Sequence, residues 1–202
     1  MTSWPFAPLQ PRGYRLILAD PPWKFATYND ANQSKKPERY YDTLAIGQIM
    51  DLPVGMLARE EGCALALWTT WPFLEQAFKV IQAWGFSYST GGPWMKLTRD
   101  GDRVAFGTGY VLRSVSEPLL LAWRGKPVIT KPVHGIIGEE FRQVEEWAIC
   151  GKLREHSRKP DQQYLLLEQL FPGPRCELFA RSERTGWAAW GNETDKFAAA
   201  AP

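Results

Sequence analysis

The chain has 202 residues and a formal net charge of +2, and 45% of its residues are hydrophobic. This length suits a single domain over residues 1–202, and the composition excludes collagen-like, disordered and disulfide-scaffold proteins. No apolar run approaches the roughly 20 residues of a transmembrane helix, and the amino terminus does not match a secretory signal. Three scattered cysteines and two histidines argue against a disulfide framework or a metal site, so we expect a cytoplasmic protein without a metal.

Apolar runs of strand length alternate with segments of helical period along the chain. In chain order the pattern predicts a strand at 14–19, a helix at 46–57, a strand at 63–68, a helix at 73–84, strands at 86–89, 93–97 and 118–123, a helix at 161–170, and strands at 176–180 and 187–190. Pro53 is expected to interrupt the first helix, and Gly85 to end the second. Strands separated by helices predict an α/β fold with one doubly wound, mostly parallel sheet.

The last helix is expected to turn Tyr164, Leu165 and Leu167 towards the core. Residues 98–116 and 126–137 show little periodicity and are expected to form loops. The chain contains 10 Trp residues, more than a core of this size needs, so some are expected to act as stacking surfaces.

The first expected strand runs directly into the segment Asp20-Pro21-Pro22-Trp23. Ligands of open α/β sheets bind outside the carboxyl ends of the strands, which is where this segment falls. A residue before a proline favours extended backbone, so Asp20 and Pro21 leave the strand stiffly. The segment therefore presents a carboxylate and a carbonyl, two acceptors at a fixed separation.

Two such acceptors followed by an aromatic ring suit the exocyclic amine of adenine. This nitrogen is a poor nucleophile because its lone pair is delocalised into the ring. Hydrogen bonds from its two N–H groups to a carboxylate and a carbonyl favour the pyramidal form and strengthen as positive charge develops. Trp23 could stack on the base and fix its plane. The alternative is a rigid strand-exit turn in which Asp20 caps a following helix.

Asp20 to Trp23 resembles the DPPW signature of the MT-A70-like N(6)-adenine methyltransferases, a family that includes the catalytic subunit of the messenger-RNA adenosine methyltransferase and bacterial and phage enzymes. Further segments resemble this family in the same order. They are Tyr40 to Leu44, Gly62 to Trp68, Trp94 to Lys96, Gly109 to Arg113 with Glu117, Arg124-Gly125, His156 to Asp161, Glu177 to Arg181 and Gly191 to Glu193.

The resemblance implies S-adenosylmethionine as methyl donor, no metal, and a Rossmann-like methyltransferase fold in which the catalytic segment precedes the cofactor strand. It implies catalytic roles for Asp20, Pro21, Pro22 and Trp23. It implies substrate contacts for Tyr41, Lys96, Arg113 and Glu117. It implies cofactor contacts for Asp20, Lys159, Arg181, Asn192 and Glu193, with Lys159 neutralising the methionine carboxylate.

The chain departs from the family pattern in two places. Longer members contribute an acidic residue upstream of the catalytic segment to the adenine pocket of the cofactor, but residues 1–19 contain none. Residues 26–39 are longer than the matching loop of the messenger-RNA enzyme and have the polar composition of an active-site lid. Polar loop filler is an equally compatible interpretation of these residues.

Together the residues and the resemblance predict methyl transfer to the N(6) amine of adenine in DNA, on a flipped-out or single-stranded base. The alternatives are the same chemistry on RNA, a non-catalytic subunit that binds nucleic acid, and a small-molecule methyltransferase. Sequence preference would come from loops, a homodimer or a partner subunit. No membrane association is expected.

Overall fold

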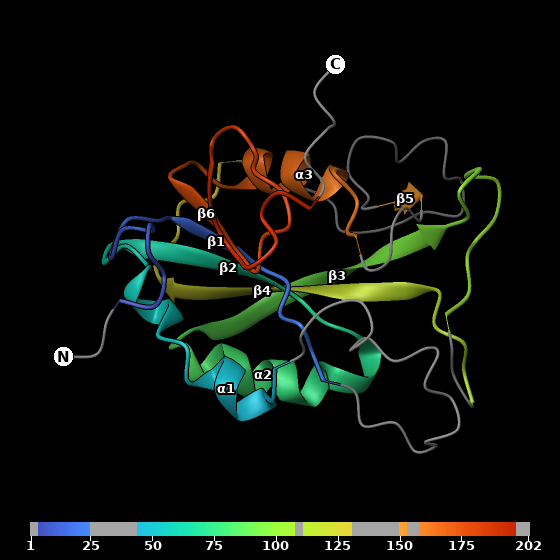
Figure 1. Ribbon diagram of the computed structural model, residues 1–202, viewed down its shortest axis with the longest axis horizontal. Helices are drawn as coiled ribbons and strands as arrows, with labels where there is room; N and C mark the ends of the chain where they lie inside the picture. The colour runs from blue at the N-terminus through green and yellow to red at the C-terminus, as the bar shows by residue number, and fades with distance from the viewer. Residues whose placement is uncertain (1–3, 25–43, 108–110, 131–149, 153–157, 197–202) are drawn as a thin grey trace.

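The computed structural model describes residues 4–24, 44–107, 111–130, 150–152 and 158–196 (Figure 1). These residues form one sheet of seven strands in the order β5-β3-β4-β2-β1-β6-β7. The elements are β1 (Leu16–Ala19), α1 (Ile46–Met50), the 3-10 turn η3 (Val54–Met56), β2 (Gly62–Trp68), the 3-10 turn η4 (Trp71–Phe73), α2 (Leu74–Ala83), β3 (Ser87–Leu97), β4 (Ser116–Gly125), β5 (Cys150–Lys152), α3 (Gln162–Leu170), β6 (Arg175–Leu178) and β7 (Trp187–Trp190).

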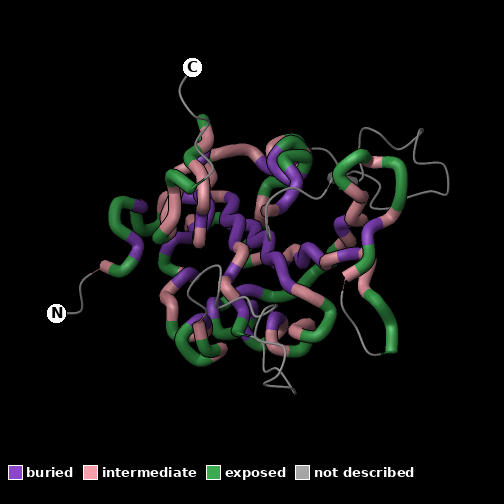
Figure 2. The backbone as a smooth tube through the Cα atoms, turned by 45° about the vertical axis from the view of Figure 1, so that its right-hand side comes forward, coloured by how far each residue is buried: buried purple, intermediate pink, exposed green. Residues whose placement is uncertain are grey.

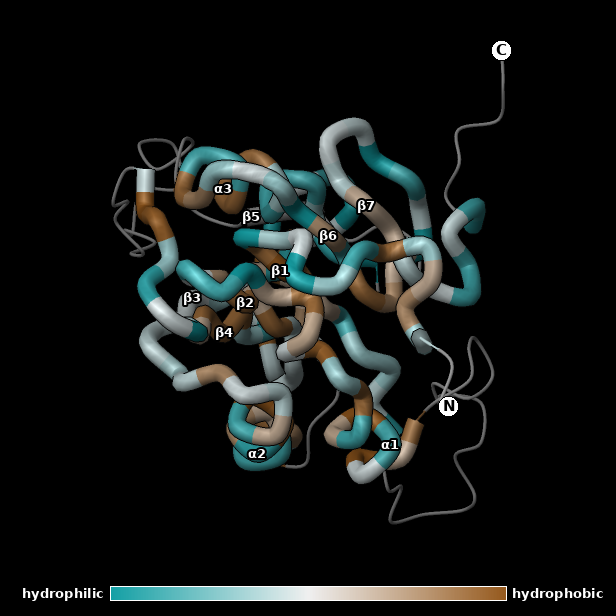
Figure 3. The backbone as a smooth tube through the Cα atoms, turned by 90° about the vertical axis from the view of Figure 1, so that its left-hand side faces the viewer, coloured by the Kyte–Doolittle hydropathy of each residue, from teal (hydrophilic) through white to brown (hydrophobic). Residues whose placement is uncertain are grey.

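The sheet is mostly parallel and is covered by helices on both faces. β1 pairs in parallel with β2 and β6, β6 with β7, and β3 with β5. β4 runs antiparallel to both of its neighbours, β2 and β3. α1 and α2 lie on one face and α3 on the other, as Figures 1 and 3 show from two directions. The predicted α/β class with a doubly wound, mostly parallel sheet is therefore confirmed.

The core lies on both faces of the two central strands. Every residue of β1 and β2 is buried, as expected for parallel strands covered on both sides. Figure 2 shows the buried residues gathered in the interior of the molecule. Successive side chains of a strand point to opposite faces, so β1 feeds two clusters. Ile17 and Ala19 pack with the layer of α1 and α2, whereas Leu16 and Leu18 pack with α3.

The order of the strands places a switch point at the carboxyl end of β1. β1 lies between β2, the next strand in sequence, and β6, to which the chain returns only after crossing the other half of the sheet. Crevices at such switch points are where open α/β sheets bind ligands. The DPPW segment begins at this point, because Asp20 directly follows β1.

Several predicted elements differ in detail. The two strands expected at 86–89 and 93–97 are one strand, β3, with a register shift between Tyr88 and Thr90. The short strand β5 was not predicted from the sequence. β6 and β7 are parallel neighbours joined by residues 179–186 without a helix. The first helix breaks before Pro53 as predicted, and α2 ends where Gly85 has a φ of +77°.

The prediction for the inward face of α3 is wrong at one position. Tyr164 and Leu167 are buried, but Leu165 is 55% exposed. Tyr164 and Leu167 are three positions apart and share one face of the helix. Leu165 comes one position after Tyr164 and is therefore rotated by about 100° away from that face. The inward position is taken by Gln163, whose side-chain carbonyl accepts a hydrogen bond of 2.6 Å from the Trp68 indole. Among the described residues no helix is long and apolar enough to cross a membrane.

Candidate active site

The site begins at the carboxyl end of β1. Ala19 is in register with Leu67 of β2 and Leu178 of β6, so Asp20 emerges between two parallel neighbours. Both carboxylate oxygens of Asp20 accept hydrogen bonds from the Lys159 ammonium, at 3.0 and 2.9 Å. The described contacts of this carboxylate therefore go to a cation and not to the start of a helix, as the capping alternative would require.

Asp20 belongs to a chain of four charges of alternating sign. The Lys159 Nζ also lies 3.3 Å from Oε2 of Glu117, and Oε1 of Glu117 lies 2.5 Å from Nζ of Lys96. The Lys159 side chain is 8% exposed, and its ammonium sits 5.6 Å from the centre of the Trp68 ring. We call Asp20, Lys159, Glu117 and Lys96 the ion network.

The topology of the sheet explains how these residues meet. Lys96 lies near the carboxyl end of β3, which runs in the same direction as β1. Glu117 lies at the amino end of β4, and because β4 is antiparallel, that end reaches the same edge of the sheet. Lys159 lies just before α3, which covers this part of the sheet. Four separate segments thus contribute one charge each.

Mutual pairing keeps the ion network charged. Burial disfavours the ammonium of Lys159, but the charges of Asp20 and Glu117 outweigh it, and the pKa of Lys159 is raised. Burial likewise disfavours the carboxylate of Glu117, yet Lys159 and Lys96 hold its pKa below the ordinary value. Pairing therefore favours the charged forms of both Lys159 and Glu117 inside the fold.

A cavity of about 320 Å³ opens on the other side of Asp20. It lies between the DPPW segment and the ends of β6 and β7. Its lining residues are Asp20, Pro21, Pro22, Leu44, Phe179, Ala180, Arg181, Trp190, Gly191, Asn192 and Glu193. Asp20 therefore belongs both to the ion network and to the wall of this cavity.

The far wall of the cavity is held in a tight backbone arrangement. The amide of Ala180 donates to the carbonyl of Trp190 at 2.9 Å, and a Cβ on Gly191 would come within 2.3 Å of the Ala180 carbonyl oxygen. Glycine is therefore required at residue 191. Phe179 has a φ of +61°, which is uncommon for a bulky residue and typical of functional sites.

The structure brings together most, but not all, of the residues predicted for the site. Asp20, Arg181, Asn192 and Glu193 all line the cavity, as a shared cofactor site would require. Lys159 does not line the described cavity and pairs with Asp20. Its contact with the donor stays a prediction.

The four residues predicted for substrate contacts divide into three groups. Lys96 and Glu117 join the ion network. Arg113 is exposed and donates to the Gly107 carbonyl at 3.2 Å, so its described contacts stay within its own loop. Tyr41 lies outside the described residues, as do residues 26–39, which were compared with a lid.

Trp23 is buried, and the stacking on the base that the sequence suggested for it stays a prediction. Its ring is 4% exposed and stacks on Phe73, with ring centres 5.7 Å apart and planes inclined by 21°. Its indole N–H donates to the carbonyl of Trp68 at 3.2 Å. One face of the ring is therefore occupied by Phe73, and the residue packs in the core, where a large apolar ring gains the most from burial.

Glu177 is a buried acid near the site, close enough for the charge of Asp20 to affect its pKa. It lies in β6, in register with Leu18 of β1, is 9% exposed, and accepts a hydrogen bond of 2.9 Å from the Tyr164 hydroxyl. Burial and the negative charge of Asp20 raise the pKa of Glu177 to about 7. A signal was present, because an acid in the middle of an apolar strand is unusual.

We expect Glu177→Gln to remove a pH dependence of stability. Below pH 7 the folded protein holds a proton that the unfolded chain releases near its ordinary pKa of 4.5, so this site loses stability as pH rises through that window. Between pH 5 and pH 8 the unfolding free energy of the wild type should therefore fall by about 2–3 kcal/mol more than that of Glu177→Gln. Denaturant unfolding at both pH values measures this difference.

The matched control is Glu183→Gln, an exposed acid in the segment after β6. Its unfolding free energy should follow that of the wild type at both pH values. A constant difference between wild type and Glu177→Gln across the range would contradict the raised pKa of Glu177.

A doubly wound sheet with a cavity and a buried ion network at its switch point is an architecture on which many α/β enzymes are built. The sequence profile of the MT-A70 family matches residues 14–193, which is most of the chain. The chain therefore belongs to the MT-A70 family.

Three relatives illustrate the range of this similarity. The chain is 27% identical over 205 residues to the type II methyltransferase M.MunI of Mycoplasma sp, covering 93% of this chain and 81% of the relative. It is 30% identical over 193 residues to the mouse N(6)-adenine-specific methyltransferase METTL4, covering 90% of this chain and 37% of the relative. It is 28% identical over 184 residues to an Arabidopsis thaliana N(6)-adenosine-methyltransferase MT-A70-like protein, covering 89% of this chain and 24% of the relative. The chain thus spans about a quarter of the plant relatives that it matches.

Proposed function

We propose that this protein transfers a methyl group from S-adenosylmethionine to the N(6) amine of adenine in DNA. The observation that carries the proposal is the position of Asp20. Its carboxylate lines a cavity suited to a small molecule and is at the same time fixed by a buried lysine. A carboxylate in this place can act on both a donor in the cavity and an amine that approaches from outside.

The residues of the cavity fit a methyl donor of this kind. A volume of about 320 Å³ lies within the range of about 300–1,000 Å³ for small-molecule sites. The carboxylates of Asp20 and Glu193 suit a ligand with cationic groups and hydroxyls, and Asn192 adds a donor and an acceptor. Arg181 can approach an anionic or polar edge of the ligand. When bound, S-adenosylmethionine supplies an electrophilic methyl group on a sulfonium.

The DPPW segment supplies the acceptors for the amine. The carbonyl of Pro21 accepts the Trp23 amide at 2.9 Å and keeps a second lone pair, and each oxygen of Asp20 keeps one beside its bond to Lys159. Hydrogen bonds from the amine to these acceptors become stronger as positive charge develops on the nitrogen, which lowers the barrier to methyl transfer. The N–C bond would form as the methyl–sulfur bond breaks, which would leave the donor as a neutral thioether. The extra proton on the nitrogen would then pass to water.

Lys159 acts as a positioning residue for this carboxylate. Its ammonium binds both oxygens of Asp20, so the carboxylate cannot rotate freely. Glu117 and the Trp68 ring hold the ammonium in turn. A fixed acceptor lowers the reaction barrier more than a mobile one, because it needs no reorganisation as the reaction proceeds.

The similarity to M.MunI supports DNA as the substrate. The chain covers 81% of that type II methyltransferase, but only about a quarter of the plant adenosine methyltransferase. In a duplex the target adenine must leave the base stack to reach Asp20, so a flipped-out or single-stranded base is required. RNA remains the alternative substrate for the same chemistry.

Methyl transfer can be tested with a labelled donor and matched DNA and RNA, each as duplex and single strand. We expect label on DNA, recovered as N(6)-methyladenine after hydrolysis to nucleosides. The control is DNA in which 2-aminopurine replaces adenine, because this base lacks the 6-amino group. Label on RNA alone would overturn the choice of DNA, and label on neither would overturn the activity.

A further inference from the structure

Trp71 presents a half-exposed aromatic ring beside the site. It begins the 3-10 turn η4, three residues beyond the end of β2, and it is 48% exposed. Scattered apolar side chains on a surface are common, so exposure alone carries no function. What distinguishes Trp71 is how it is held and what lies next to it.

The ring of Trp71 is fixed although one side of it faces solvent. Its indole N–H donates to Oγ of Ser116 at 3.1 Å, and Ser116 is itself 8% exposed. Pro72 restricts the backbone of the turn, and the amide of Phe73 donates to the carbonyl of Thr70 at 2.9 Å. A ring with its polar atom satisfied and its orientation set is prepared to receive another flat ring.

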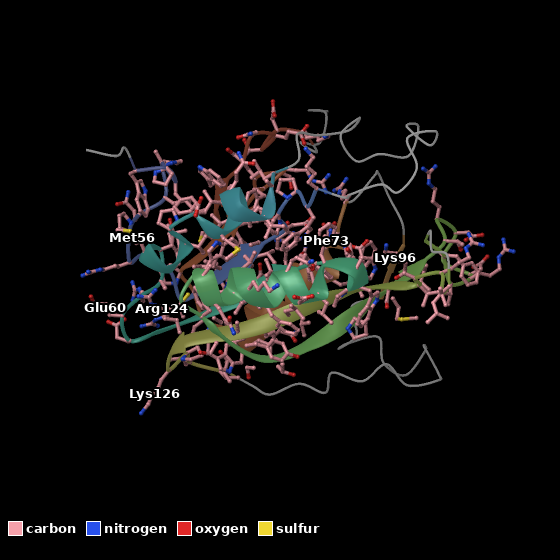
Figure 4. The ribbon with its side chains drawn as sticks, turned by 90° about the horizontal axis from the view of Figure 1, so that it is seen from below. Met56, Glu60, Phe73, Lys96, Arg124 and Lys126 are labelled. Atoms are coloured by element: carbon pink, nitrogen blue, oxygen red, sulfur yellow. The ribbon has the colours of Figure 1, made fainter. Side chains whose placement is uncertain are left out.

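Trp71 lies at the same edge of the sheet as the ion network. The residue that holds its indole, Ser116, directly precedes Glu117. Phe73 of the same turn, which stacks on Trp23, lies on the side of Lys96 in Figure 4, away from Met56 and Arg124. Ala19 is in register with Leu67 of β2, so Asp20 leaves the sheet beside Trp68, three residues before Trp71.

We propose that Trp71 stacks on the base next to the target adenine in the nucleic-acid strand. This inference rests on the proposed function, since it concerns the substrate of the same site. Every base offers a flat face to an aromatic ring, and such stacking tolerates any sequence. Trp23 does not offer an exposed face, because Phe73 and the core enclose it. Trp71 supplies the exposed aromatic face that Trp23 lacks.

The contact can be tested by a double-mutant cycle between protein and oligonucleotide. The ligand is a DNA strand with one adenine, used intact or with an abasic site 5′ or 3′ of that adenine, and binding is followed by fluorescence anisotropy. Trp71→Ala and one of the two abasic sites should each weaken binding by about 5- to 100-fold. Combining them should cost little more than either change alone, because both remove the same contact.

The matched control is Tyr88→Ala. Tyr88 is also 48% exposed, but it lies in β3 opposite Ala122, far along the strands from this edge, and its ring contacts Phe78. This variant should bind like the wild type. Trp71→Phe should retain most of the affinity, because it keeps a ring.

If Trp71→Ala does not fold, Ser116→Ala provides the second variant, since it frees the indole and should weaken binding with the same coupling to the abasic site. Additive effects at both abasic positions, or equal losses in Trp71→Ala and Tyr88→Ala, would overturn the inference. These binding results do not depend on catalysis. Methylation of DNA without coupling between Trp71→Ala and an abasic site would reject the stacking role of Trp71 and leave the proposed function intact. Coupling without methylation would reject the proposed function and leave the stacking role intact.

Discussion

Replacing Asp20 with alanine should reduce methyl transfer to adenine by about 1,000-fold or more while donor binding stays measurable. The variant removes the acceptor that strengthens as charge develops on the amine, and it leaves the rest of the cavity wall in place. It also leaves Lys159 with Glu117 as a remaining partner, so the fold should survive. Single-turnover transfer measures the rate, and isothermal titration calorimetry measures donor affinity.

Asp20→Asn separates the two roles of this carboxylate. The amide keeps the size and one acceptor oxygen but loses the charge that binds Lys159. We expect its rate to fall between those of the wild type and Asp20→Ala. Undiminished transfer by Asp20→Ala would show that the amine is not held at the end of β1.

Replacing Lys159 with methionine should cost about 3 kcal/mol of unfolding free energy at pH 7, at the lower end for a broken buried ion pair. The lysine side chain is 8% exposed and binds two carboxylates, so its loss leaves two negative charges facing one another. Glu117 keeps Lys96 as a partner, and Asp20 is 22% exposed, which limits the cost. Denaturant unfolding of both proteins measures the difference.

The effect of Lys159→Met should depend on pH in a defined way. Glu117 has a lowered pKa in the fold, so its stabilising contribution is present above the ordinary value of 4.5 and is lost as pH falls through the folded pKa. Lys159 has a raised pKa, so its contribution is present below 10.5 and is lost as pH rises through the folded pKa. The difference between the proteins should therefore be largest between these limits.

Lys96→Met is the matched control for this variant. It removes one lysine from the same ion network but leaves Glu117 and Asp20 joined by Lys159. Its cost should be clearly smaller. Equal unfolding free energies for wild type and Lys159→Met at pH 7 would show that the buried pair does not stabilise the fold.

The sequence predicted the elements of the fold well where periodicity decides them. Buried strands such as β1 and β2 appear as short continuous apolar runs, and α2 shows the spacing of one covered face. The direction of β4 is not visible in this pattern, because an apolar strand has the same appearance whether it runs parallel or antiparallel. That direction nevertheless brings Glu117 to the edge where Asp20 lies.

The aromatic residues show the limit of reading single positions. Trp23 and Trp71 are the same type of residue, and the motif favoured Trp23 as the stacking ring. In the fold, Phe73 covers Trp23, while Ser116 holds Trp71 with half of its surface exposed. Whether a ring faces the core or the solvent depends on neighbours that are distant in the sequence, so local pattern could not decide it.

By itself, the sequence determined the α/β class, the DPPW segment at the end of the first strand, and the order in which the family's motifs follow one another. These features are local, because they depend on residue types at fixed short spacings. Only the tertiary structure decided that Lys159 pairs with Asp20, that Glu177 is a buried acid with a raised pKa, and which Trp lies exposed at the site. Ion pairing, burial and exposure are set by segments that meet only when the sheet has formed.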